Sequence, residues 1–375
     1  RVCLDFRAQN QQTVPAPFPL PNIGSVLERI RGSKYFCRLD HSSGFLQVPM
    51  SEASSVYTAF STEDGHFEFL RMPFGVTNAP LHFQAIMVDV LGSLLHHGVE
   101  DYMDDILIHS QTMDGLCKNL SGVLELLRSR GLRLNRKKCL FGVEQIEFLG
   151  HTVSESGVAV SDNRKQSLLN IPTPTTVKQL RQLLGAWNYV RDHIPDFASI
   201  AAPLFALLMG KKTTKSHPLA WTPQASAALS SLRSKINDVP LLHFVEPDNP
   251  LYLETDASEI GIGAVLFQED SDGKKKVIAY VSKAFRDSSL RWTIMEKEAF
   301  AVYFSVNKLR HFLLGRKFVI RSDCKNLLFG TSTIPKVQRW TLRLQEFDFE
   351  IQHIRGQENV VADALSRLNL ITDDH

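Results

Sequence analysis

The sequence has no long hydrophobic run and little cysteine. Its longest apolar stretches, such as 204–209, are far shorter than the ~20 residues that a membrane-spanning helix needs, so we expect no membrane protein. The first twenty residues lack the pattern of a signal peptide, which argues against secretion. The five cysteines are scattered and never spaced as CxxC, so neither a disulfide framework nor a zinc site is indicated. A reducing cell interior fits this composition best.

An excess of charge of one sign is also missing. The formal net charge is +2, with 43% hydrophobic and 22% charged residues, which is typical of a soluble globular protein and excludes a polycation. The charge is uneven, however, because 128–138 holds six cations and 308–321 holds five. Such patches fit a contact with phosphates. For either patch alone, a solvated helix end is the simpler interpretation.

The chain of 375 residues exceeds one ordinary core and predicts two or three domains. Strand-like and helical patterns alternate in the first part, with a hairpin signal at Asp64-Gly65. The middle part has apolar residues at helical spacing, and strand patterns return from Leu251. The sequence therefore predicts a multidomain α/β (α+β) fold with three domains and a tail, which are residues 1–155, 156–245, 246–370 and 371–375.

The stretch VEDYMDDILIHS, residues 99–110, places four acids within six positions and then returns to apolar residues. Like charges this close repel, and a carboxylate in an apolar strand pair is costly unless it is paired or holds a metal. The segment is therefore either an exposed acidic turn or a site where Asp104 and Asp105 bind a cation. Asp40 follows the apolar run 35–39 and is a natural third partner at the end of a neighbouring strand.

A second set of acids stands at the edges of predicted elements in the last third of the chain. They are Asp256, Glu298, Asp323 and Asp363. Two Mg²⁺ ions about 3.5–4 Å apart can neutralise the attacking and leaving oxygens of phosphoryl transfer, and Mg²⁺ prefers carboxylates together with water and phosphate oxygens. Both sets of acids fit this chemistry. Each acid taken singly is more simply a surface residue.

Nine motifs follow one another in the order of a known family. The first five are RVCLDFRAQN, RLDHSSGFLQVPM, FEFLRMPFGVTNAP, YMDDILIHS and FLGHTVSESGV. The last four are LETDASEIGIGAVL, EKEAFAVYF, RSDCKNL and NVVADALSR. Together they resemble the reverse transcriptase–ribonuclease H (RNase H) portion of gypsy-type LTR retrotransposon Pol polyproteins, with retroviral polymerases as more distant relatives. The first five resemble the last fingers strand, the first catalytic motif, the template-facing turn, the YxDD motif and the primer-grip hairpin, and the last four resemble the RNase H motifs.

This resemblance implies a right-hand polymerase palm with partial fingers, a mainly helical thumb or connection and a C-terminal RNase H-like mixed α/β domain. It implies an RNA-directed DNA polymerase that copies RNA into DNA and an RNase H that degrades the RNA of the RNA–DNA hybrid. The implied partners are RNA template, DNA primer, RNA–DNA hybrid and deoxynucleoside triphosphates, in the cytoplasm, including virus-like particles, or in the nucleus. No membrane partner is implied, and the oligomeric state is not specified.

By the same resemblance, each set of acids would hold two Mg²⁺ ions, or Mn²⁺ in their place. The polymerase acids would be Asp40, Asp104 and Asp105. The RNase H acids would be Asp256, Glu298, Asp323 and Asp363. Glu298 is preferred over Glu296 because the family acid directly precedes an apolar run, represented here by 299–301. Glu296 fits a helix capping box with Thr293 better.

The resemblance also implies residues that contact nucleotide and primer. The nucleotide-binding positions would be Arg1, Phe45, Pro73, Phe74 and Gly75. The primer-grip positions would be Phe148, Leu149 and Gly150. Phe45 lies five residues after Asp40, where an aromatic ring leaves no room for a 2′-hydroxyl. The alternative for Phe45, Phe148 and Leu149 is packing in the core, and the alternative for 73–75 is a plain Pro-Gly loop. Arg7, in the first motif, is as easily explained by a structural role as by a contact with the nucleotide.

Three departures from the family pattern leave other functions open. The chain starts at the last fingers strand, so it does not contain the preceding hairpin or the lysine expected to grip the triphosphate. Glu100 and Asp101 replace apolar residues, and an unpaired Glu100 in a half-buried strand would weaken the palm. Cys324 stands where the family usually has His. The alternatives are an RNase H-only nuclease and a catalytically inactive retroelement remnant that binds nucleic acid.

Overall fold

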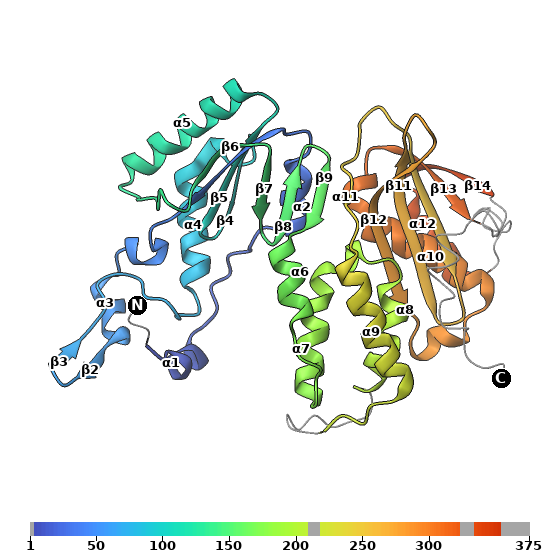
Figure 1. Cartoon of the computed structure of the whole chain (residues 1–375), viewed down its shortest axis with the longest axis horizontal. Coiled ribbons are helices and arrows are strands. Elements are labelled where there is room, and N and C mark those ends of the chain that lie inside the picture. Colours follow the sequence, from blue (N-terminus) through green and yellow to red (C-terminus); the bar gives the residue numbers. More distant parts are fainter. Residues whose placement is uncertain (1–3, 209–217, 323–333, 354–375) are drawn as a thin grey trace. The chain divides into compact units, whose positions relative to one another are not determined.

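Two compact units make up the chain, residues 1–155 and residues 156–375. The structure is a computed structural model and describes residues 4–208, 218–322 and 334–353. Figure 1 labels the helices and strands along the chain. Within the described ranges, no helix combines the length and the apolar character needed to cross a membrane.

A four-stranded antiparallel sheet forms the centre of the first unit. Its strands, in the order β4-β5-β1-β6, are β4 (Val99–Tyr102), β5 (Asp105–Ser110), β1 (Tyr35–Asp40) and β6 (Leu140–Val143). β4 and β5 form the hairpin predicted for VEDYMDDILIHS, and β5 pairs with β1 along the full length of both strands. The prediction that 35–39 is a strand with Asp40 at its end is confirmed.

Two helices cover this sheet and close its core. α4 (Ala79–Leu91) has Pro80 in its first turn, where proline leaves no helical hydrogen bond unmade. α5 (Met113–Ser129) begins at Thr112, whose side chain accepts a hydrogen bond from the Gly115 amide. Both helices share one buried cluster with β1, β4 and β5, so they pack on the same face (Figure 1). This core fixes the strand ends that carry the acids.

Shorter elements complete the first unit. They are α1 (Arg7–Gln12), α2 (Ile23–Arg29), η1 (Gly44–Gln47), α3 (Glu52–Ser55), η2 (Val56–Thr58), β2 (Phe60–Thr62), β3 (Gly65–Phe67), η3 (Gly92–Leu94), β7 (Gln145–Phe148) and β8 (His151–Ser154). The hairpin predicted at Asp64-Gly65 is confirmed as β2–β3.

The strand expected in RVCLDFRAQN is wrong for its described residues. Residues 4–6 are irregular, and a helix begins at Arg7. The cause is local, because the Asp5 carboxylate accepts hydrogen bonds from both the amide and the guanidinium of Arg7. The polar run that follows also lacks the apolar alternation of a strand.

Helices dominate the first part of the second unit, after a short strand β9 (Gly157–Val160). They are α6 (Asp162–Leu169), α7 (Val177–Trp187), η4 (Asn188–His193), α8 (Phe197–Ala206) and α9 (Pro223–Asn237). α7 begins with a capping box between Thr176 and Gln179. Trp187 is fully buried in the apolar cluster that these helices share. The predicted helical character of this segment is confirmed.

A five-stranded mixed sheet follows. Its strands, in the order β12-β11-β10-β13-β14, are β12 (Lys275–Ala284), β11 (Gly261–Glu269), β10 (Leu251–Ala257), β13 (Lys317–Ser322) and β14 (Asp348–His353). The first three are antiparallel neighbours, whereas β13 is parallel to both β10 and β14. The remaining elements are η5 (Asp287–Arg291), α10 (Ile294–Lys308), α11 (Arg310–Leu313) and α12 (Pro335–Leu344). The helix expected in NVVADALSR lies outside the described residues.

Candidate active sites

The β4–β5 hairpin brings the first set of acids to one end of the sheet. Asp40 ends β1, and the antiparallel register sets it directly opposite Asp105 at the start of β5. Side chains of directly opposite residues lie within contact distance. Asp104 immediately precedes Asp105 in the tight turn, where Met103 adopts a φ of 57°. Acids that are far apart in the sequence are thus neighbours in the fold.

Burial and charge shape this corner. Burial raises the pKa of Asp105, and the Asp40 carboxylate adds to the rise, while Arg38 and Lys138 oppose it. One oxygen of Asp40, Oδ2, lies 3.4 Å from the Lys138 ammonium. The other, Oδ1, is buried and has no hydrogen-bond partner within the described part of the chain. A buried acceptor without a donor is stabilised when a cation approaches it.

The acids are neighbours, but they are not gathered as a ligand set. Among the residues that the structure describes, no group of three or more His, Cys, Asp or Glu side chains lies close enough to hold a metal ion. Carboxylates repel one another, and Lys138 draws one oxygen of Asp40 toward itself. The donor chemistry nevertheless fits Mg²⁺, because all three residues offer carboxylate oxygens. Side-chain rotation has to bring these oxygens together around an ion.

Gln84 on α4 fixes the shape of the hairpin. Its Nε2 donates to Asp101 Oδ2 at 2.6 Å, and its Oε1 accepts from the Met103 backbone N–H at 2.7 Å. Gln84 is buried, and its hydrogen bond to Asp101 forms away from water, where such a bond is stronger. Burial also raises the pKa of Asp101 well above its usual range, which favours the neutral acid. Gln84 therefore holds the β4 side of the turn that presents Asp104.

Two of the expected nucleotide contacts lie side by side. The ring of Phe45 lies 5.4 Å from the ring of Phe74 and 5.6 Å from the ring of Phe83 in the core, measured between centroids. Phe45 is half-buried, so one part of its ring packs and the other part faces solvent. Pro73 is buried, whereas Gly75 is exposed and has a φ of 96°, which glycine adopts most readily.

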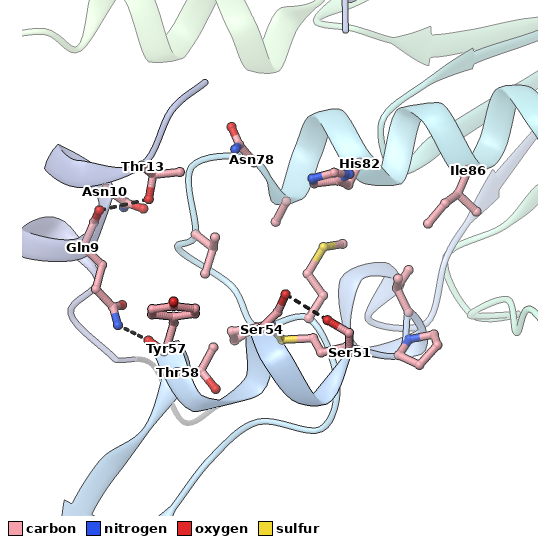
Figure 2. A pocket seen from close by; sticks show the side chains of 17 residues that line it. Gln9, Asn10, Thr13, Ser51, Ser54, Tyr57, Thr58, Asn78, His82 and Ile86 are labelled. Atoms are coloured by element: carbon pink, nitrogen blue, oxygen red, sulfur yellow. Dashed lines mark hydrogen bonds between the residues drawn. The ribbon is translucent and has the colours of Figure 1, made fainter. Parts of the chain in front are cut away.

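A pocket of about 420 Å³ adjoins the turn that carries Pro73. Figure 2 shows Asn10 of α1 on one side of this pocket and His82 of α4 on the other. Asn10 braces the turn, because its Nδ2 donates to the Gly75 carbonyl at 2.8 Å and its Oδ1 accepts from the Thr77 N–H at 2.9 Å. The segment expected to meet template and nucleotide is therefore held in place by α1.

The primer-grip segment forms a second tight turn. Phe148 ends β7 and is buried, which is the core role that the sequence left open for it. Leu149 and Gly150 connect β7 to β8 with φ values of 49° and 71°. A positive φ strains the backbone of a leucine, and strain of this kind is most often found at functional sites. Arg1 lies outside the described residues, and Arg7 is exposed and paired with Asp5.

The second set of acids is described in part. Asp256 lies in β10 and Glu298 in α10, which packs against β10, and both side chains are buried. β13 runs parallel beside β10 and ends at Ser322, the residue before Asp323. Asp323 and Asp363 lie outside the described residues. Two buried acids on adjacent elements form a costly arrangement that a cation stabilises.

Glu296, two residues before Glu298, caps the helix as predicted. Its side chain accepts from the Thr293 backbone N–H at 2.9 Å, and Thr293 Oγ1 accepts in turn from the Glu296 amide. Glu296 also pairs with Lys336 of α12 at 2.9 Å. These partners lower the pKa of Glu296, chiefly through the Thr293 amide. The two acids of this helix therefore have different environments.

Comparisons with known proteins identify the family. The family model for reverse transcriptase (RNA-dependent DNA polymerase) matches residues 1–153, and the model for the RNase H-like domain found in reverse transcriptase matches residues 246–347. The chain is 35% identical over 378 residues to the Retrovirus-related Pol polyprotein from transposon 297 of Drosophila melanogaster. It is 34% identical over 375 residues to the Transposon Tf2-3 polyprotein of Schizosaccharomyces pombe. The chain belongs to the reverse transcriptase–RNase H region of gypsy-type retrotransposon Pol polyproteins.

This reverse transcriptase–RNase H chain spans only part of those relatives. The two matches cover 100% and 98% of the chain but 35% and 28% of the polyproteins, which is about a third of their length. Among solved structures, a foamy viral protease-reverse transcriptase in complex with dsDNA matches with a TM-score of 0.78 and 25% identity, over 95% of this chain and 75% of that one. A related dRH structure in complex with ds DNA also has a TM-score of 0.78, with 26% identity over 94% and 62%. The predicted α+β multidomain fold is confirmed.

Glu100, which departs from the reverse transcriptase pattern, is paired. Arg29 on α2 donates two hydrogen bonds of 2.8 Å to its carboxylate, and His96 Nδ1 lies 3.1 Å from it. The Glu100 side chain is only 1% exposed, so the carboxylate of this ion pair is buried. The condition for a weakened palm, an unpaired Glu100, is therefore not met.

Arg29→Met is expected to lower the free energy of unfolding by about 3 kcal/mol, because it leaves the buried Glu100 carboxylate with His96 as its remaining partner. Chemical denaturation at neutral pH measures this change. Arg31→Met is the matched control, since its partner Glu28 is 19% exposed and keeps contact with water. The control should lose under about 1 kcal/mol. Equal losses in the two variants would contradict the assignment.

Sequence reasoning does not single out the three residues that brace the polymerase part of this reverse transcriptase. They are Asn10, Arg29 and Gln84. Two acids inside an apolar strand require buried partners, and this requirement indicates that residues such as Arg29 and Gln84 exist without showing where in the chain they lie. Gln84 also interrupts the apolar face of α4, as a buried polar residue with a specific partner does. For Asn10 the sequence carries no comparable signal.

Proposed function

We propose that this chain is an RNA-directed DNA polymerase with RNase H activity, which copies RNA into DNA and degrades the RNA strand of the RNA–DNA hybrid. The observation that carries the proposal is the β1–β5 register, which sets Asp40 opposite Asp105 beside the turn with Asp104. The buried Asp256 and Glu298 in the other unit support a second site. The two matched families, which generally use divalent metal ions, support the same pair of activities.

In the polymerase site, Asp40, Asp104 and Asp105 would hold two Mg²⁺ ions, or Mn²⁺ instead. When bound, the ions supply positive charge to the primer 3′-hydroxyl and to the triphosphate of the incoming nucleotide. The residues around them provide orientation. Gln84 holds the hairpin turn. The ring of Phe45, which lies five residues after Asp40, would form an aromatic wall with the neighbouring ring of Phe74.

In the RNase H site, Asp256 and Glu298 would bind the same kind of ion. Asp323 and Asp363 would join them, which rests on the sequence motifs alone. The ions would supply charge for the attack of a water on the RNA strand. The burial of Asp256 and Glu298 lowers the local dielectric, which strengthens their attraction for a cation. Glu296 takes no part in this chemistry, because its side chain caps α10.

The proposed partners are an RNA template, a DNA primer, the RNA–DNA hybrid and deoxynucleoside triphosphates. Two foamy viral reverse transcriptases of similar structure were solved in complex with ds DNA, which supports a nucleic-acid partner. The basic segment 128–138 ends at Lys138 beside Asp40, which supports contacts with phosphates near the polymerase acids. Phosphate contacts make binding weaken steeply with salt.

We also propose the three-domain division of the chain. The matched ranges 1–153 and 246–347 support a palm with partial fingers in 1–155 and an RNase H domain in 246–370. The helical cluster between them supports a thumb or connection in 156–245, with 371–375 as a tail. The free thiols of Cys37, Cys117 and Cys139 support action in a reducing compartment, the cytoplasm or the nucleus.

Two assays on the wild-type chain test this function. We expect Mg²⁺-dependent extension of a DNA primer on an RNA template, and Mg²⁺-dependent cleavage of the RNA in a labelled RNA–DNA hybrid. Cleavage without extension would replace the proposal with an RNase H-only nuclease. Hybrid binding without either activity would replace it with an inactive nucleic-acid-binding remnant.

Phe45→Val is expected to raise ribonucleotide incorporation relative to deoxynucleotide incorporation by about 10- to 100-fold, because it opens space for a 2′-hydroxyl. Primer extension with each nucleotide type measures the ratio of kcat/KM values. Phe60→Val is the matched control, since the Phe60 ring packs on Phe67 and Phe69 in the β2–β3 region. Unchanged sugar discrimination in Phe45→Val would refute the assignment.

A further inference from the structure

A basic and aromatic pocket in the second unit is separate from both sets of acids. Its volume is about 330 Å³, which is in the range of sites that hold a small ligand. Arg191, Lys283 and Arg286 contribute three positive charges to it, and Phe205, Trp292 and Phe300 contribute aromatic rings. No Asp or Glu is among the described residues that line it.

Two of these cations are held by aromatic rings instead of acids. Lys283 Nζ lies 4.2 Å from the centroid of the Phe304 ring and 5.0 Å from that of Phe300. The Arg286 guanidinium lies 5.7 Å from the centroid of Phe205. Among the side chains that the structure describes, which do not include that of Asp287, no carboxylate is paired with Lys283 or Arg286. Burial and the nearby charge of Arg286 lower the pKa of Lys283. Two adjacent cations attract an anion.

The frame of the pocket is fixed by hydrogen bonds. Arg191 donates through Nη2 to the Ser282 carbonyl at 2.8 Å, and Ser282 Oγ accepts from the Ala198 N–H at 3.1 Å. The Ser289 hydroxyl donates to the Arg286 carbonyl at 2.6 Å and accepts from the Arg286 amide at 2.7 Å. The backbone that carries Lys283 and Arg286 is therefore ordered before any ligand arrives, which favours binding.

The sheet register relates this pocket to the RNase H acids. Asp256 on β10 lies opposite Gly263 on β11, and Gly263 lies opposite Ser282 on β12, the residue before Lys283. Two strand spacings, roughly 10 Å, separate the backbones at these positions, and the alternation of side chains along β12 points Lys283 to the sheet face opposite that of Asp256, on the edge strand of the sheet. Successive phosphates of one strand advance by about 3.4 Å along a duplex, so a single nucleic-acid strand spans this distance within a few nucleotides.

We propose that Lys283 and Arg286 bind one phosphate of a nucleic-acid strand, and that the surrounding rings pack against the attached nucleotide. Ammonium and guanidinium groups match phosphate oxygens, and aromatic rings stack on bases without regard to sequence. This inference rests on the proposed function, because the strand is the one that the RNase H site engages. The pocket anchors that strand while Asp256 and Glu298 act a few nucleotides away.

Fluorescence anisotropy with a labelled RNA–DNA hybrid in EDTA tests the anchor on the full chain. The double variant Lys283→Gln, Arg286→Gln should raise Kd by about 10-fold and reduce the slope of log Kd against log salt by about 1. Lys283→Arg should keep the wild-type Kd. In cleavage assays with Mg²⁺, the double variant should raise KM and leave kcat unchanged.

Lys276→Gln is the matched control, because Lys276 lies on the same strand and is neutralised by Glu246 at 2.8 Å. It should change neither Kd nor the salt slope. A double variant that binds like the wild type would overturn the anchor and leave the proposed function standing. A wild-type chain that does not bind the hybrid would overturn both. Displacement of the hybrid by thymidine monophosphate at matched ionic strength would overturn the strand as the ligand and assign the pocket to free nucleotides.

Discussion

Asp104→Asn is expected to abolish primer extension on an RNA template while cleavage of the RNA–DNA hybrid persists. Charge stabilisation in a two-metal site is worth several kcal/mol, so losing one metal-binding carboxylate should reduce the extension rate by at least about 10³-fold. The hybrid-cleaving site has its own acids in the second unit, including Asp256 and Glu298. Single-turnover extension and hybrid cleavage, measured on the same preparation, give both rates.

Asp101→Asn is the control for this variant, since Asp101 lies three positions earlier in the same hairpin. Burial raises the pKa of Asp101 and favours its neutral form, which Asn reproduces in shape and charge. The Asn side chain can still accept the hydrogen bond from Gln84 through Oδ1. We expect near wild-type extension. Equal losses in Asp101→Asn and Asp104→Asn would mean that extension depends on the hairpin fold and not on the Asp104 carboxylate.

Asp256→Asn is expected to give the opposite result, with hybrid cleavage lost by at least about 10³-fold and primer extension retained. Asp256 is buried in β10, and α10, which packs against β10, carries a second buried acid, Glu298. Removing its charge leaves too few anionic oxygens to hold a pair of divalent ions there. Loss of both activities together would argue against two separate sites.

A pair of substitutions on α10 sharpens this test. Glu298→Gln should abolish hybrid cleavage, whereas Glu296→Gln should retain it, although the residues are two positions apart. Glu296→Gln keeps an acceptor for the Thr293 amide but removes the charge that pairs with Lys336 and favours the helix N-terminus, which costs under about 1 kcal/mol of folding free energy. Thermal unfolding separates that effect from catalysis. Loss of cleavage in Glu296→Gln with an intact fold would show that the acid has been assigned to the wrong position.

The sequence predicts the local elements of both sites well, because their signals are local. The hairpin around Asp104 and Asp105 follows from two apolar runs around an acidic turn, and the structure has β4 and β5 there. The cap of α10 follows from Thr293 and Glu296, and both of its hydrogen bonds form. Spacing alone suggests only that Asp40 ends a neighbouring strand. The family motifs add that Asp40 lies beside the acids of this hairpin.

The contacts that brace the sites could not be predicted, because they join residues far apart in the chain. Arg29 neutralises Glu100 across two elements, and nothing in the local sequence of α2 marks that arginine. The last fingers strand was expected from the motif, yet Asp5 and Arg7 pair locally and a helix follows. The anchor pocket likewise arises from packing of α8 against β12, two segments with no shared pattern.

Crystals of the chain with an RNA–DNA hybrid and Mn²⁺ test the central claim, that acids distant in sequence gather around divalent ions at two places. In the described residues these carboxylates are neighbours but not yet a ligand set, so the ions have to draw them together. Anomalous difference maps should show Mn²⁺ peaks bound by oxygens of Asp40, Asp104 and Asp105, and others bound by Asp256 and Glu298. A bound hybrid with no Mn²⁺ peak at either set of acids would contradict the account.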